Sequence, residues 1–506
     1  MDQMKNALIP EGTAKPAQKA PRIYKTTALS RLILAASLAL CLLLVNAATW
    51  PWGMGNTVTV FAWYALLLPA MGWGALLRRR ESRVLLAYNL LLAASFALTS
   101  NPWFRLWNFL ALVLLVPIHT ASLAFGDLLP WWRPAMVGER LGLLCRGAFC
   151  HLGAAPAAIS AGREKKSLSL TVVLGAAAAL ALVSALLPVL ASADALFAAA
   201  TQGLVEFIRL HFARELWKLF WALALTPFLF GLLYCLRHVP VQTKARTLYT
   251  VDSALFAIIL GALDVLYLLF LAVQSAGLFG GPEYLAQRGI SYADWARNGF
   301  FQMVGVTILN LAAVMASLTF SQQESRGWRA VQGLSAALVG ESLILLASAA
   351  WRMTLYVSAY GLSFKRFMTY WGMVMMALFL LSALEKTRRP DRSFCRRALP
   401  LALAGWLAIN CIPVDYLVAK NQVDRYLSGE SPILSVHYLA YALSYDTFSQ
   451  LERLDPALPL AICEGDWWSR QHTAGSLVEK RRAAAQEDCA DWRSWNLSAC
   501  LAAGRN

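Results

Sequence analysis

Long apolar runs alternate with short polar segments over most of this chain. A membrane-spanning α-helix needs roughly 20 mainly apolar residues to cross a hydrocarbon core of about 30 Å. Eleven runs approach that length: 32–50, 57–77, 84–98, 106–124, 168–190, 219–236, 252–277, 299–320, 330–349, 367–384 and 398–414. The pattern predicts an all-α fold, a polytopic transmembrane helix bundle of about 11 spans within residues 29–414.

The segments on either side of this block have a different character. Residues 1–28 are polar and contain Lys and Pro, and we expect a disordered cytoplasmic segment there. In residues 415–506, apolar positions recur at spacings of three and four, as in Tyr416, Val423 and Leu427. That spacing predicts a small, mainly helical C-terminal domain.

Composition supports the membrane interpretation. Hydrophobic residues make up 58% of the 506 positions, and charged residues only 15%, against about 25% in soluble domains. The mean hydropathy is +0.51. These values exclude a disordered chain, a secreted disulfide scaffold and a single soluble enzyme domain.

The formal net charge of +16 is explained by topology. Of the 45 basic residues, 27 fall before the first run and in alternate connections, 9 in the other connections and 9 after residue 414. Cytoplasmic loops carry such an excess of Lys and Arg. We therefore expect a multi-pass membrane protein with a cytoplasmic N-terminus, which in a bacterium would reside in the cytoplasmic (inner) membrane. An odd span count then places the C-terminal domain outside, in the periplasm or on the outer surface.

This arrangement also identifies the partners. Basic loops such as 78–83 and 385–397 meet anionic lipid head groups, so the lipid bilayer is the first partner. No basic stripe is interleaved with aromatic residues on a soluble module, and we expect no nucleic-acid binding.

Two carboxylates lie well inside predicted spans. Asp264 is near the middle of 252–277, and Glu341 is near the middle of 330–349. Charges at that depth are expensive, and such residues are functional hypotheses by default. One interpretation is a proton or ion path built on both. The alternative is a protonated pair, or hydrogen bonds to Asn310, Tyr267 or Ser342 within the bundle.

A second group of unusual residues borders the predicted outer face. It combines glycines that permit tight turns with aromatic and cationic side chains: Gln274, Gly280, Gly281, Tyr292, Trp295, Arg297, Arg352, Tyr356, Tyr360 and Gly361. The functional interpretation is a cleft for a ligand or partner, with Arg297 and Arg352 binding an anionic group. The alternative is that these residues are interfacial anchors.

The order of these residues resembles a family. Gln274 through Gly281, then Tyr292 to Phe300, then Arg352 through Leu362 look like the bacterial membrane family called domain of unknown function 4173, related to 4153. Asn421 with Arg425, and Tyr438 through Asp446, resemble its segment after the membrane block. The resemblance implies a multi-pass bacterial membrane protein and brings no catalytic residues.

The cysteines and a search for common enzyme motifs give little evidence of catalytic activity. We expect one disulfide, Cys463–Cys489, in the C-terminal domain, where oxidation is possible. Walker A, GxSxG, HExxH and strand-linked GxGxxG motifs are absent. A zinc site needs a full ligand set, and we expect no metal and no cofactor.

Three functions remain in order of preference. The first is a non-catalytic sensing, regulatory or envelope-assembly role, with a binding face on the outer side for another envelope protein or a lipid head group. The second is a transporter or flippase that uses the intramembrane carboxylates. The third is a membrane-embedded transferase. The connection 51–56, however, has no acidic residue of the kind that large glycosyltransferases carry there, and we expect no histidine within the membrane spans to support an acyltransferase.

Overall fold

The computed structural model is mainly helical in the residues that it describes. These are Tyr24, 27–47, 52–71, 79–124, 129–131, 133, 135–160, isolated positions between 175 and 197, 213–238, 250–279, 289, 300–460 and 472–504. In this part of the chain, extended pairing is limited to two isolated bridges, Val251 with Ser321 and Pro459 with Thr473. The all-α prediction is confirmed.

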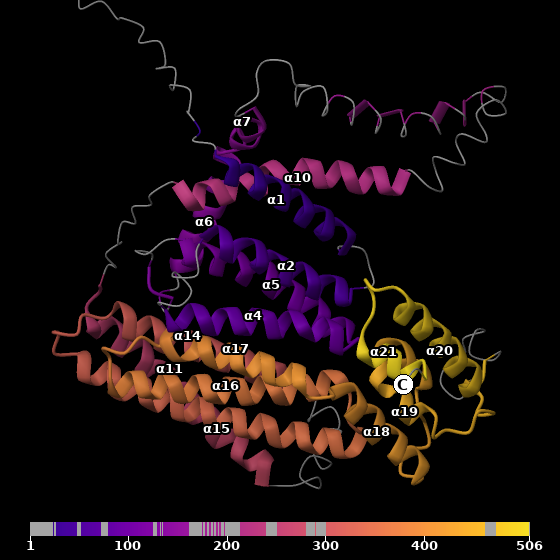
Figure 1. Cartoon of the computed structure of the whole chain (residues 1–506). Helices are drawn as coiled ribbons and strands as arrows, with labels where there is room; N and C mark the ends of the chain where they lie inside the picture. The colour runs from indigo at the N-terminus through magenta and orange to yellow at the C-terminus, as the bar shows by residue number, and fades with distance from the viewer. Residues whose placement is uncertain are drawn as a thin grey trace, which may run out of the picture.

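An N-terminal group of helices forms one half of the bundle (Figure 1). Its members are α1 (Ala28–Ala47), α2 (Met54–Met71), α4 (Arg80–Leu98), α5 (Pro102–Ala124), α6 (Ala135–Cys150), α7 (Ala154–Ser160) and α10 (Ala213–His238). Buried Tyr64, Leu67, Leu92 and Phe96 form the centre of its hydrophobic core.

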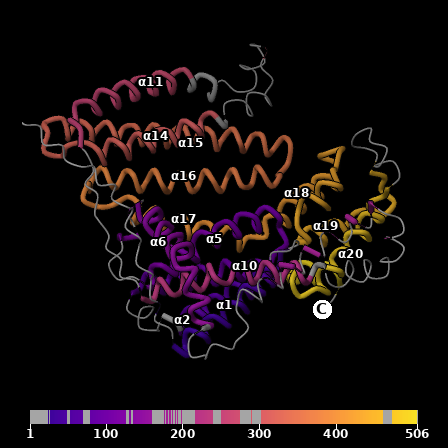
Figure 2. The backbone as a smooth tube through the Cα atoms, turned by 90° about the horizontal axis from the view of Figure 1, so that it is seen from above, coloured from indigo at the N-terminus to yellow at the C-terminus, as the bar shows by residue number. Residues whose placement is uncertain are grey.

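A C-terminal group forms the other half (Figure 2). It consists of α11 (Ser253–Phe279), α14 (Phe300–Phe320), α15 (Trp328–Tyr360) and α16 (Phe364–Arg388). The 33-residue helix α15 is its centre, and the other three pack along it. Leu338, Leu345 and Leu380 are buried in a core separate from that of the N-terminal group.

Helix α17 (Cys395–Cys411) lies at the seam between the two groups. Asn108 of α5 accepts a hydrogen bond from Trp406 Nε1 at 2.7 Å and donates to Asn410 Oδ1 at 2.7 Å and Ser95 Oγ at 2.8 Å. In an apolar surrounding such groups have to find protein partners. The polar cluster around Asn108 therefore fixes α17 against α4 and α5.

The helix lengths fit a multi-pass membrane protein. Among the described residues, eight helices are long and apolar enough to span: α1, α4, α5, α10, α11, α14, α15 and α16. The pair formed by α17 and α18 (Val414–Leu427), bent by 50°, adds a ninth. Helix α2 lies where the span 57–77 was predicted, but it is not among the eight helices that are long and apolar enough to cross a membrane. The predicted span 168–190 lies largely outside the described residues.

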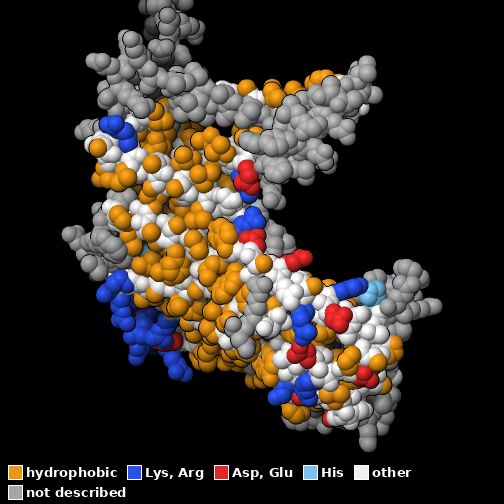
Figure 3. All heavy atoms as spheres, turned by 45° about the vertical axis from the view of Figure 1, so that its right-hand side comes forward, with side chains coloured by type: hydrophobic (Ala, Val, Ile, Leu, Met, Phe, Trp, Pro, Cys, Tyr) orange, Lys and Arg blue, Asp and Glu red, His pale blue; other side chains and the backbone are white. Residues whose placement is uncertain are grey.

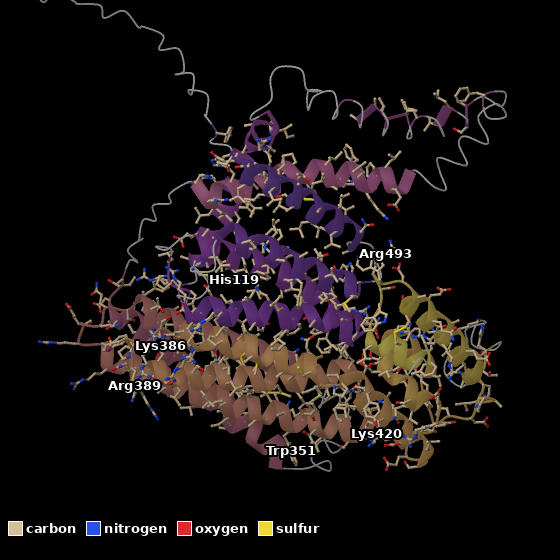
Figure 4. All side chains as sticks on the ribbon, in the orientation of Figure 1. His119, Trp351, Lys386, Arg389, Lys420 and Arg493 are labelled. Carbon is tan, nitrogen blue, oxygen red and sulfur yellow. A yellow bond between two sulfur atoms is a disulfide. The ribbon has the colours of Figure 1, made fainter. Side chains whose placement is uncertain are left out.

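The two ends of the bundle differ in charge. Lys386, Arg389 and the neighbouring arginines cluster at one end, which we call the basic end (Figures 3 and 4). Residues 415–460 and 472–504, which we call the C-terminal region, cover the opposite, tail-bearing end (Figure 1). Hydrophobic side chains cover the flank between these ends in Figure 3, as expected of a surface that faces lipid.

The C-terminal region consists of short helices. These are α18, η2 (Tyr438–Ala442), η3 (Tyr445–Thr447), α19 (Phe448–Leu451), α20 (Ala474–Ala490) and α21 (Leu497–Ala502). Its hydrophobic core is continuous with the bundle, because Val418, Leu439 and Leu451 pack in one cluster with Phe104 and Ile409.

The disulfide differs from the prediction. Cys489 pairs with Cys500, 11 residues away, with a Cα–Cα separation of 5.3 Å, and Cys463 lies outside the described residues. The turn after α20 brings the two cysteines together, because Asn496 accepts a hydrogen bond from Ala499 N and so starts α21 beside the end of α20. The predicted pairing of Cys463 with Cys489 is wrong.

Candidate functional site

The outer-face residues predicted from the sequence are only partly described by the structure. Gly280, Gly281, Tyr292, Trp295 and Arg297 lie outside the described residues, and so does the side chain of Gln274 in α11. The remaining four, Arg352, Tyr356, Tyr360 and Gly361, follow one another along the last turns of α15 and its end. The structure thus brings these four to the tail-bearing end.

The aromatic pair of this set stabilises the end of α15. The rings of Tyr356 and Tyr360 are 4.9 Å apart, and the Arg366 guanidinium lies 4.4 Å from the centre of the Tyr356 ring. Arg366 also donates to the carbonyls of Tyr360 and Gly361. A cation at a helix C-terminus satisfies carbonyls that have no partner within the helix. Tyr356 and Tyr360 therefore belong to a helix cap.

Gly361 permits a sharp turn against α18. Its φ is +75°, a conformation that favours glycine. A Cβ atom there would also come within 2.9 Å of Gln422 Nε2. Directly after it, the Leu362 amide donates to Asn421 Oδ1 at 2.7 Å, and the Leu362 carbonyl accepts from Gln422 at 2.6 Å.

Arg352 lines a cavity deeper in the C-terminal group. The cavity has a volume of about 340 Å³, and its walls come from α11, α14 and α15. Apart from Arg352 the lining includes Tyr267, Phe270, Met303 and Leu345. Since only 7% of Arg352 is exposed, its charge is held inside the protein at the edge of an apolar space.

The two intramembrane carboxylates lie next to this cavity. Asp264 on α11 and Glu341 on α15 are buried and interact electrostatically with each other. Among the described residues, neither oxygen of Asp264 has a hydrogen-bond partner. Asn310 Nδ2 donates to Ser342 Oγ at 2.9 Å, and Tyr267 lies against Asn310. The polar residues predicted as partners thus gather nearby, but their hydrogen bonds do not satisfy Asp264.

The attachment of the C-terminal region is a polar site that the sequence pattern did not reveal. Asp415 Oδ2 accepts from Asn101 Nδ2 at 2.7 Å and from Ser444 N at 2.9 Å. Ser100 Oγ accepts from Tyr445 N at 2.9 Å. Asp415 is 2% exposed, so these are buried bonds, and those made by Asn101 and Ser100 link residues more than 300 positions apart.

A hydrogen bond to a carboxylate and a cation–π contact also stabilise the attachment of the C-terminal region. Tyr445 Oη donates to Asp488 Oδ2 at 2.9 Å, and the Arg481 guanidinium lies 4.0 Å from the centre of the Tyr445 ring. Burial raises the pKa of Asp488, although the Tyr445 hydrogen bond and the nearby Arg105 and Arg481 oppose the shift. Burial likewise raises the pKa of Tyr445 to about 12.

A buried histidine corrects the sequence analysis. His119 lies within the predicted span 106–124, in α5, and is fully buried (Figure 4). Its Nδ1 is 2.9 Å from Tyr64 Oη, which accepts a hydrogen bond from Asn89 at 2.7 Å. A single His within an apolar run is the signal that could have identified this site. Nowhere in the described part of the chain do three His, Cys, Asp or Glu residues gather as a metal site.

Comparison with known proteins identifies the family. The model of the family called Domain of unknown function (DUF4153) matches residues 86–454. The chain belongs to this family. The match begins within α4 and ends just beyond α19. It includes the N-terminal group from α4 onward, the whole C-terminal group with the cavity, and the first half of the C-terminal region, whereas α1 and α2 precede it. No curated protein and no solved structure matches the chain.

Proposed function

We propose that the chain is a non-catalytic binding protein of the bacterial cell envelope, with a sensing, regulatory or assembly role. In this proposal it resides in the cytoplasmic (inner) membrane and binds its ligand or partner at the tail-bearing end. The resemblance to the related family called domain of unknown function 4173 is part of this proposal.

The cavity beside Arg352 carries this proposal. Ligand sites are typically concave and largely apolar, with a few polar groups that orient the ligand, and volumes start at about 300 Å³. The space between α11, α14 and α15 has this size and an almost wholly apolar lining, and Gln302 and Arg352 lie at its edge. The fixed attachment of the C-terminal region provides a stable surface next to it.

The orientation rests on charge and on contacts. The predicted cytoplasmic segment 385–397 lies at the basic end. The predicted outer connections contact the C-terminal region, through Gly53 against Ser494, Asn101 with Asp415 and Leu362 with Asn421. Enzyme reporters fused after Arg397 and after Asn506 test this orientation. We expect activity in opposite compartments, and the same compartment for both would overturn it.

Photocrosslinking tests the binding face. A benzoylphenylalanine at position 356 keeps an aromatic ring next to Arg366 and lies one helical turn above Arg352. The matched control is position 351, since Trp351 is an exposed residue of the same helix that does not line the cavity (Figure 4). We expect a discrete adduct, to a lipid or a protein, from position 356 and not from 351. Equal labelling from both positions, or none, would contradict the proposal.

The carboxylate pair favours a second candidate, a transporter or flippase. Asp264 and Glu341 lie about 17 and 20 Å along their helices from Ser253 and Trp328, close to the middle of a core of about 30 Å. Both oxygens of Asp264 and Oε2 of Glu341 are buried without a hydrogen-bond partner among the described residues, and intramembrane carboxylates form the proton relays of pumps and transporters. In reconstituted vesicles, Asp264→Asn and Glu341→Gln would abolish a proton flux that the wild-type protein supports. Wild-type vesicles without flux would remove this candidate.

A further inference from the structure

We infer that the intramembrane carboxylates Asp264 and Glu341, together with the amide oxygen of Asn310, bind a hard divalent cation such as Mn²⁺ or Ca²⁺. The ion would lie where α11, α14 and α15 meet, near the middle of the membrane. This inference does not depend on the binding face at the tail-bearing end, and it gives the carboxylates a ligand other than the proton of the second candidate function.

The first argument is that the polar side chains lie in one cluster. Asp264 on α11 and Glu341 on α15 interact electrostatically. Glu341 also acts on Tyr267, which follows Asp264 by about one helical turn, and Tyr267 interacts with the side chain of Asn310 on α14. Asn310 Nδ2 in turn donates to Ser342 Oγ at 2.9 Å, directly after Glu341. Three helices therefore bring polar groups to the same place.

The second argument is the kind of atom that lacks a partner in this cluster. Both oxygens of Asp264, Oε2 of Glu341 and Oδ1 of Asn310 are buried without a hydrogen-bond partner among the described residues. Ionised carboxylate oxygens and amide oxygens are acceptors only, whereas the donor of Asn310 is already bonded to Ser342. A ligand that satisfies these four atoms therefore has to bring positive charge.

The Asn310 oxygen makes this more than an acidic pair. Asn310 is 1% exposed, and leaving a buried acceptor unsatisfied costs free energy. Protonation can neutralise Asp264 and Glu341, but an amide oxygen does not take up a proton at ordinary pH. Binding of one ion by both carboxylates and the amide would satisfy all three side chains together.

The third argument is the charge balance. The ion pairs found among the described residues all lie elsewhere and include neither Asp264 nor Glu341. These two residues are 5% and 6% exposed, and unbalanced charges within a membrane are expensive. One divalent cation neutralises two carboxylates, whereas a monovalent cation leaves one negative charge unbalanced.

The oxygen atoms of the cluster fit a hard cation. Ca²⁺, Mg²⁺ and Mn²⁺ prefer carboxylate, carbonyl and water oxygens. The described residues contain no group of three His, Cys, Asp or Glu side chains, and the sequence alone predicts no metal. In the proposed site the neutral amide oxygen of Asn310 takes the place of a third charged ligand, so a search for charged ligands does not find it.

Mn²⁺ binding to the full-length protein in a neutral detergent tests the inference, because electron paramagnetic resonance measures the free ion. We expect one Mn²⁺ per wild-type chain, displaced by Ca²⁺ and not by Na⁺. Asp264→Asn and Glu341→Gln should each weaken binding at least about tenfold, since even the loss of a group behind the metal ligands costs about 10–100-fold. The matched control Glu324→Gln removes an exposed carboxylate just before α15 and should leave the affinity unchanged.

Two further variants test the amide. Asn310→Leu removes the oxygen but keeps a side chain of similar size, and it should weaken Mn²⁺ binding at least about tenfold. Ser342→Ala removes the acceptor that orients Asn310 and should weaken binding about tenfold. Its control is Ser382→Ala on α16, where the hydroxyl bonds to the Leu378 carbonyl of its own helix.

Thermal unfolding separates binding from folding. In chelator-treated protein, Asp264→Asn should be at least as stable as the wild type, because a buried charge is removed. Mn²⁺ should raise the unfolding temperature of the wild type, since a ligand that binds the folded state stabilises it. It should not raise that of Asp264→Asn.

The outcomes are distinct. Absence of Mn²⁺ binding by the wild type, or equal binding by the wild type and Asn310→Leu, overturns the inference even if a carboxylate variant fails to fold. Equal loss in Glu324→Gln assigns the ion to the surface, and displacement by Na⁺ assigns a monovalent cation; both overturn it. Proton flux without Mn²⁺ binding leaves only the second candidate function. Mn²⁺ binding without a crosslink from position 356 leaves the inference standing while the proposed function fails.

Discussion

Asn421 of α18 and Leu362, just after α15, are joined by a hydrogen bond of 2.7 Å from the Leu362 amide to Asn421 Oδ1. One helical turn further, Arg425 donates to the carbonyls of Ser358 and Ala359 at 2.8 and 3.1 Å. Two residues that sequence resemblance singled out therefore clamp the C-terminal region onto the end of α15.

Removing the Asn421 side chain should loosen this clamp. Asn421→Ala leaves the Leu362 amide without its acceptor in a partly buried place, which costs about 1–2 kcal/mol. We expect earlier proteolysis within residues 415–504 and a lower unfolding temperature in detergent. Lys420→Ala changes the exposed neighbouring residue (Figure 4) and should behave like the wild-type protein; equal loss in both variants would contradict the role of Asn421.

Asp488 should make the stability of the C-terminal region depend on pH. Burial raises its pKa in the folded protein above the ordinary value of 3.8, so the folded state binds a proton more readily than the unfolded state. The free energy of unfolding should therefore fall as the pH rises from 3.8 through the raised pKa. Asp488→Asn keeps an acceptor for Tyr445 and should reduce this dependence. If the free energy of unfolding changes with pH equally in the wild type and the variant between about pH 3.5 and 7, the range in which carboxyl groups titrate, this prediction is wrong.

The disulfide offers a direct test of the corrected pairing. In protein oxidised in the cell envelope, Cys463→Ser should leave the bridge intact, whereas Cys489→Ser and Cys500→Ser should each expose one new thiol. Thiol labelling of the unfolded, unreduced chain followed by mass spectrometry counts these thiols. Losing a bridge that closes so short a loop should cost about 2–3 kcal/mol. A bridge that is lost in Cys463→Ser would restore the original prediction.

Asn108 should hold the seam between the helix groups. Asn108→Ala removes the acceptor of Trp406 and the donor to Asn410, and we expect a loss of about 1–3 kcal/mol in unfolding free energy. Leu110→Ala on the exposed side of the same helix is the control, with a change of about 0.5 kcal/mol or less. Thermal unfolding in detergent measures both, and similar losses would argue against a special role for Asn108.

The local pattern of apolar residues predicts the helices, but it does not predict the contacts between residues that are far apart in the sequence. Apolar runs of membrane length identified nearly every described span, since each helix satisfies its own backbone hydrogen bonds. Asp415 and Asn101 are 314 positions apart, and nothing in the local sequence of either residue specifies the other. The same limit explains the wrong cysteine pairing, because spacing alone does not show that Asn496 starts a helix beside Cys489.

The position of the candidate site was predicted in part. The sequence predicts Arg352 either as an anion-binding residue or as an interfacial anchor, and in the structure Arg352 lines a cavity. The cavity itself depends on how α11 and α14 diverge along α15, which amphipathic patterns do not encode. Tyr356, Tyr360 and Gly361 were grouped with a binding site, but their contacts show a helix cap and a turn.

The C-terminal region touches both helix groups at once. It meets the N-terminal group at Gly53 and Asn101, and the C-terminal group at Leu362 and Phe364. Any tilt of one group against the other therefore has to break these bonds or carry the C-terminal region along. A change in the angle between the two helix groups is therefore coupled to the position of the C-terminal region.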